Sequence, residues 1–86
     1  MIIEESNILT LSDGNEYVVV LKINKDNLDY FFLIDTNNDS NVKFCYQDDV
    51  ELVEIEDPNK IRELVMVFGE RAKQLLPEDI LEKLEN

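Results

Sequence analysis

The chain has 86 residues, of which 20 are acidic and 8 are basic, so its net charge is −12. This length fits a single small domain, which we expect to span residues 1–86. The negative charge would repel nucleic acid and anionic lipid, and no apolar stretch approaches the roughly 20 residues of a membrane span. Residues 1–5 also lack the features of a signal peptide. We therefore predict a cytoplasmic protein with no membrane attachment and no direct nucleic-acid binding.

The first two-thirds of the chain predicts short strands separated by polar turns. Asp13-Gly14 is a pair suited to a tight hairpin turn, and Lys25-Asp26-Asn27 is a second polar turn. The strands themselves are rich in β-branched and aromatic residues, which favour extended structure. We expect them at residues 8–11, 16–24, 28–36, 42–47 and 50–55.

The last third changes to a helical period. Asp57 is a good N-cap, and Pro58 suits the first helical position. Apolar residues then recur on one helical face, which predicts a long helix over residues 58–76. Pro77 begins a short final helix over residues 78–85, whose apolar side would be Ile80, Leu81 and Leu84. The predicted fold class is α+β, with a small antiparallel β-meander of four to five strands followed by one long C-terminal helix and a short final helix.

The predicted sheet has apolar residues on both faces. Tyr17, Val19, Leu21 and Ile23 share one side of their strand and would receive the helix. The opposite side of the strands is also apolar. On the long helix, Met66 and Val67 lie away from the main apolar face. Either strong curvature and the final helix cover these residues, or they form a partner surface. The possible partner surface comprises Val18, Val20, Phe31, Leu33, Met66 and Val67.

The sequence has few residues suited to catalysis. It contains no histidine, the usual general base and common metal ligand. Cys45 lies in a predicted strand between two aromatic residues, which indicates an inert thiol. Residues 35–40 begin like a calcium loop, but Ser40 and Tyr46 stand where that motif needs glycine and glutamate. We expect a polar turn there, and we predict no enzyme, no catalytic residue, no metal site and no cofactor.

Several segments resemble a family of small acidic bacterial proteins, the YrzB-like domain of unknown function. The resemblance begins with the strand, Asp-Gly turn and strand of residues 8–16 and continues at Tyr30 to Leu33. It ends with residues 52–57 leading into a helix that carries Val65 and Phe68. This likeness covers about residues 8–70 and consists of residue types, without a catalytic signature. It implies a bacterial cytosolic protein of one compact domain and supplies no biochemical role.

The acidity is concentrated in one part of the chain. Residues 1–57 contain 14 acidic and 3 basic residues, whereas residues 58–86 contain 6 and 5. We expect a non-enzymatic protein–protein interaction module whose partner could be basic. One alternative is a nucleic-acid mimic that occupies a nucleic-acid-handling protein, and another is a structural homodimer. The charge could also serve solubility alone.

Overall fold

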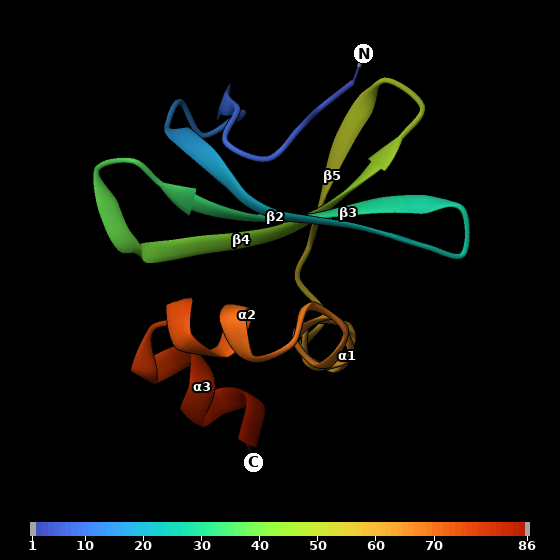
Figure 1. Ribbon diagram of the computed structural model, residues 1–86. Coiled ribbons are helices and arrows are strands. Elements are labelled where there is room, and N and C mark those ends of the chain that lie inside the picture. Colours follow the sequence, from blue (N-terminus) through green and yellow to red (C-terminus); the bar gives the residue numbers. More distant parts are fainter. Residues whose placement is uncertain (1, 86) are drawn as a thin grey trace.

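The computed structural model describes residues 2–85, and the side chains of residues 2–82. A five-stranded antiparallel sheet forms the first part of the molecule, and its strands lie side by side in chain order. The sheet is curled, so that its two ends rise on the side opposite the helices (Figure 1). The strands are β1 (Ile8–Thr10), β2 (Glu16–Lys25), β3 (Leu28–Asp35), β4 (Asn38–Asp48) and β5 (Glu51–Ile55).

Tight two-residue turns explain why β2 pairs with β3 and why β4 pairs with β5. Asp26 and Asn27 join β2 to β3, and both have positive φ angles, of 54° and 67°. That combination is typical of the type I′ turn, whose twist matches the twist of paired strands. The predicted polar turn at these residues is therefore confirmed. Asp49, with a φ of 57°, begins the two-residue turn between β4 and β5.

Three short helices follow the sheet: α1 (Pro58–Phe68), α2 (Glu70–Leu75) and α3 (Glu78–Glu85). Asp57 caps α1 by accepting a hydrogen bond from the backbone N–H of Asn59, as its position predicts. The prediction of one long helix over residues 58–76 is wrong, because the helix breaks at Gly69. Its φ of 85° and ψ of −162° lie in a region that essentially only glycine occupies. None of these helices has both the length and the apolar character needed to cross a membrane.

An irregularity in β2 changes which face of the sheet its alternate side chains occupy. Val19 pairs with Leu33, but Leu21 pairs with Phe32, so the register shifts by one residue at Val20. Such a bulge reverses the alternation of side chains along the strand. Tyr17 and Val19 therefore face away from the helices, whereas Leu21 and Ile23 face toward them. The prediction that these four residues share the helix-covered side is wrong for Tyr17 and Val19.

Two hydrophobic clusters fill the two sides of the sheet. The helix-side cluster includes the ring of Phe32, which stacks on Phe44 with ring centroids 4.9 Å apart, and the buried side chain of Leu64. Burial of these side chains holds the helices against the sheet. The N-terminal-side cluster consists of buried Ile3, Tyr17, Val19, Phe31, Leu33 and Cys45, with Leu9, Leu11 and Leu52 packed against them.

The side chain of Leu84 lies outside the described residues, so only part of the predicted apolar side of the final helix can be placed. Ile80 and Leu81 pack against the helix-side cluster. Met66 and Val67 on α1 remain 74% and 46% exposed, so the final helix does not cover them. Ile80 instead lies near Ile61, close to the start of α1, and both residues line a second small hollow.

Candidate functional site

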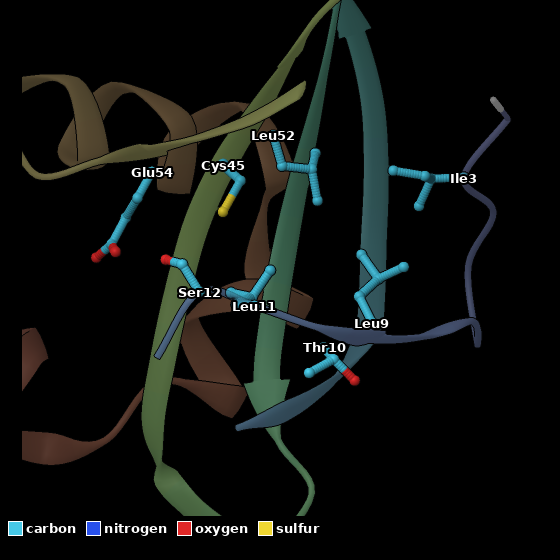
Figure 2. A pocket seen from close by; sticks show the side chains of 8 residues that line it. All are labelled: Ile3, Leu9, Thr10, Leu11, Ser12, Cys45, Leu52 and Glu54. Carbon is cyan, nitrogen blue, oxygen red and sulfur yellow. The ribbon is translucent and has the colours of Figure 1, made fainter. Parts of the chain in front are cut away.

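A hollow of about 390 Å³ lies where the two ends of the curled sheet approach each other. We call it the edge hollow. Figure 2 shows Ile3, Leu9 and Leu11 on one side of it and Cys45 and Leu52 on the other. Its full lining comprises Ile3, Leu9, Thr10, Leu11, Ser12, Cys45, Leu52 and Glu54.

The edge hollow exists because the curled sheet stops short of closing. β1 has only three residues, and it pairs with β2 alone among the described strands. β5 stands at the opposite end of the sheet order and pairs only with β4. The apolar side chains of Leu9, Leu11 and Leu52 are consequently half-buried, because no further strand covers them.

Residues 2–7, which precede β1 and are called the N-terminal segment below, close one side of the hollow. Hydrogen bonds hold this segment to β2. The backbone N–H of Ser6 donates to the carbonyl of Val19 at 2.8 Å. The backbone N–H of Lys22 donates to the carboxylate of Glu5 at 3.1 Å. These contacts fix the segment so that Ile3 is only 2% exposed. Ile3 therefore belongs to the N-terminal-side cluster and forms a fixed wall of the hollow.

Glu54 supplies the charge at the rim of the edge hollow. Its carboxylate accepts a hydrogen bond from the ammonium group of Lys43 at 3.2 Å. Burial alone would lower the pKa of Lys43, but the hydrogen bond and negative charge of Glu54 more than offset it, so the pKa is raised. The Lys43 ammonium also lies 5.9 Å from the ring centroid of Tyr17. Glu54 is therefore ion-paired with a basic residue of this chain.

Cys45 is buried at the floor of the hollow, and its surroundings suppress its reactivity. Burial, with a contribution from the charge of Glu54, raises the pKa of the thiol to about 11. The thiolate is the nucleophile in cysteine chemistry, and a reactive thiol needs a lowered pKa. The geometry therefore gives this thiol no support as a catalytic nucleophile.

We expect Cys45 to be alkylated at pH 8 about a hundredfold more slowly than a free cysteine, because its thiolate is scarce and its side chain is 2% exposed. The rate can be followed with iodoacetamide and mass spectrometry. It should rise about tenfold for each pH unit above pH 8 and level off only near pH 11, the pKa of the folded thiol. The chain unfolded in urea provides the control, and it should react at the normal rate. Fast alkylation of the folded chain would contradict this assignment.

A polar network links the turn between β1 and β2 to the turn between β3 and β4, beside the N-terminal-side cluster. The Tyr17 hydroxyl donates to the carboxylate of Asp13 at 2.7 Å, and this bond lowers the pKa of Asp13. The side-chain amide of Asn41 donates to the Tyr17 hydroxyl at 2.9 Å and to the carboxylate of Asp35 at 3.0 Å. Asp35 is 7% exposed and also accepts from the backbone N–H of Asn37. These bonds satisfy buried polar groups and fix the turns.

The segment that resembled the start of a calcium loop takes part in this turn structure. Asp35 ends β3, and the side chain of Asn38 accepts a hydrogen bond from the backbone N–H of Ser40. The side-chain oxygens of Asp35 and Asn38 thus accept local backbone hydrogen bonds. The turn itself is limited to residues 36–37, because residues 38–40 already belong to β4, so the expected polar turn over residues 35–40 is only partly right. Over the part of the chain that the structure describes, no group of three or more acidic or cysteine side chains is arranged to hold a metal ion.

The structure does not bring the residues of the predicted partner surface together. Phe31 and Leu33 are fully buried in the N-terminal-side cluster, because the curled sheet and the N-terminal segment cover them. Val18 and Val20 are half-buried. Met66 and Val67 are exposed on α1, which packs on the other side of the sheet. These six residues therefore do not form one continuous surface.

The edge hollow was not among the sequence predictions. A partial signal exists in the order Leu9-Thr10-Leu11-Ser12, where apolar and polar residues alternate as in a half-buried strand. A second signal is Leu52 followed two residues later by Glu54, which places an apolar and an acidic side chain on one face of β5. Neither signal shows that the two strands approach each other, because that depends on the curl of the whole sheet.

Comparison of the chain with protein-family models, with curated proteins and with solved structures finds no match. The resemblance to the YrzB-like family therefore stays a prediction. The geometry that bears on function is the apolar edge hollow, the free edge of β5 beside it and the acidic side chains along that strand.

Proposed function

We propose that this chain is a non-enzymatic interaction module of the cytoplasm that binds a basic segment of another protein at β5 and the edge hollow. The observation that carries the proposal is an apolar hollow with one exposed acidic residue, Glu54, in its lining, beside two further acidic residues at either end of β5. Glu51, Glu54 and Glu56 are all exposed. Glu51 and Glu56 form no ion pair with any basic side chain that the structure describes.

Opposite charge would steer a basic partner toward this edge, and apolar contact in the hollow would retain it. Electrostatic attraction raises association rates and weakens as salt screens it. Burial of apolar surface supplies affinity that is less sensitive to salt. The cytoplasmic location is part of the proposal because the chain has a single cysteine, and that residue is a free thiol.

The proposal predicts that a fluorescent oligolysine peptide binds the chain at low salt and is released as salt rises. Neutralising the two acidic residues of β5 and the one that follows it in a triple variant, Glu51→Gln, Glu54→Gln and Glu56→Gln, should weaken this binding by about tenfold or more. Fluorescence anisotropy measures both effects.

A matched control removes the same number of charges from α2 and α3 by combining Glu70→Gln, Glu78→Gln and Asp79→Asn. It should bind almost as tightly as the parent chain, because these residues lie in helices outside the β5 edge. Equal weakening by the two triple variants would mean that only net charge matters, and the proposed site would then be wrong.

A further inference from the structure

The outer edge of β5 carries unpaired backbone groups in addition to its acidic side chains. β5 is the last strand of the sheet, and β4 is its only partner among the described strands. An unpaired edge of this kind can accept an additional strand from another chain.

The hairpin register identifies the outward-facing groups. Asp48 pairs with Glu51 across a two-residue turn, so these residues form the first hydrogen-bonded pair of the hairpin. Hydrogen-bonded and non-hydrogen-bonded pairs alternate along antiparallel strands. Val53 therefore bonds toward β4, whereas the N–H and C=O groups of Leu52 and Glu54 point away from it.

The side chains of the same two residues lie on the hollow side of β5, Leu52 within the lining and Glu54 at the rim. Leu52 and Glu54 both line it, together with Cys45 and residues of β1 (Figure 2). A strand added to β5 would place the side chains opposite Leu52 and Glu54 on this face. The hollow volume of about 390 Å³ lies within the roughly 300–1,000 Å³ range of ligand pockets. It can thus receive a side chain of the added strand.

Charge decides between a second copy of this chain and a basic partner. Two β5 strands paired with each other would bring the exposed acidic residues of both copies, Glu51, Glu54 and Glu56, to one shared edge, where like charges repel. Each copy also carries a net charge of −12. A basic strand instead gains from these glutamates, and its charge complements the exposed Glu56 beyond the strand.

We propose that a basic, extended segment of another protein adds to β5 as an antiparallel sixth strand. It places a Lys or Arg opposite Glu54 and an apolar residue, two positions along, opposite Leu52 and into the edge hollow. This inference rests on the proposed function and specifies its binding mode. The backbone of the segment would form hydrogen bonds with the backbone of Leu52 and Glu54. Its basic side chain would pair with the carboxylate of Glu54, and its apolar side chain would occupy the hollow.

The test uses a short synthetic peptide in which Lys and Val alternate on one face and Thr fills the other face. Two further versions carry backbone N-methyl groups, either on the Lys and Val residues or on the Thr residues. Residues opposite Leu52 and Glu54 would donate their N–H groups to β5, so methylating Lys and Val should weaken binding by about tenfold or more. Methylating Thr should leave affinity within about twofold of the parent peptide, because those N–H groups face away.

Hydrogen exchange provides a second measurement on the unmodified chain. The amides of Leu52 and Glu54 should become protected when the parent peptide binds, whereas the amide of Val53 should change little because it already bonds within the sheet. Equal binding of the two methylated peptides, or no added protection at Leu52 and Glu54, would overturn strand addition. The salt-dependent binding of oligolysine would then still support the proposed function, so the two failures are distinguishable.

Peptide binding, the oligomeric state and a charge variant at Glu54 test the basic partner and its pairing with β5. Failure of the unmethylated peptide to bind at low salt would overturn it. A concentration-dependent dimer that the peptide dissociates, detected by sedimentation, would show that a second copy occupies the edge and would overturn the choice of a basic partner. Weaker binding to the Glu54→Gln variant than to the Asp39→Asn variant, which removes an exposed acid at the start of β4, would support the assigned pairing.

Discussion

Replacing Phe32 with alanine should lower the free energy of unfolding by about 3–5 kcal/mol, the usual cost of truncating a buried phenylalanine. Phe32 is 0% exposed, stacks on Phe44 and also contacts the ring of Phe68, with centroids 6.3 Å apart. The substitution would leave a cavity between the sheet and α1. Because small domains are stable by only about 5–15 kcal/mol, this loss should shift the denaturation midpoint markedly. Urea denaturation followed by circular dichroism measures the change.

Met66→Ala provides the control for this measurement. Met66 is 74% exposed, so its truncation should change the free energy of unfolding by no more than about 0.5 kcal/mol. Similar effects of the two substitutions would show that the packing of Phe32 against the helices contributes little. In that case α1 would be held mainly by its short connection to β5.

The variant Gly69→Ala should lose about 1–3 kcal/mol of stability, which is the cost of a non-glycine residue in a strained backbone region. A Cβ atom at Gly69 would meet no heavy atom within 4 Å, so crowding is not the cause. The cost should arise because the φ of 85° and ψ of −162° disfavour any side chain. Urea denaturation measures the loss, and far-ultraviolet circular dichroism reports the helix content.

An exposed site on α2 serves as the comparison for Gly69. Lys73→Ala changes a helical residue whose backbone angles suit alanine, so its effect should be within about 0.5 kcal/mol. A Gly69→Ala variant with unchanged stability and higher helix content would contradict the expectation. It would mean that α1 and α2 can join into one continuous helix without disturbing the core.

Local sequence signals predicted the features that depend on neighbouring residues. Asp57 and Pro58 marked the start of α1, and Asp26-Asn27 marked a hairpin turn, because a cap or a tight turn needs only a few adjacent residues. The apolar periodicity of residues 58–76 predicted an unbroken helix. Such a pattern shows which side chains share a helical face, but it carries no information about the φ and ψ angles of Gly69, where the helix ends. Gly69 was the signal for the break, but an isolated glycine in a helical pattern is often tolerated.

Features that depend on distant residues were not predictable from the sequence. Strict alternation placed Tyr17, Val19, Leu21 and Ile23 on one side, and only the pairing of β2 with β3 reveals the shift at Val20. The partner surface that included Phe31 and Leu33 assumed a flatter sheet, whereas the curled sheet buries both residues. The edge hollow likewise depends on β1 and β5 approaching each other, which neither strand encodes alone.

The shift at Val20 has a consequence for how the domain unfolds. One half of β2 belongs to the N-terminal-side cluster and the other half to the helix-side cluster, so a single backbone segment connects the two clusters. Neither cluster can lose β2 without weakening the other. We therefore expect a single cooperative unfolding transition, in which the helices and the N-terminal segment detach together.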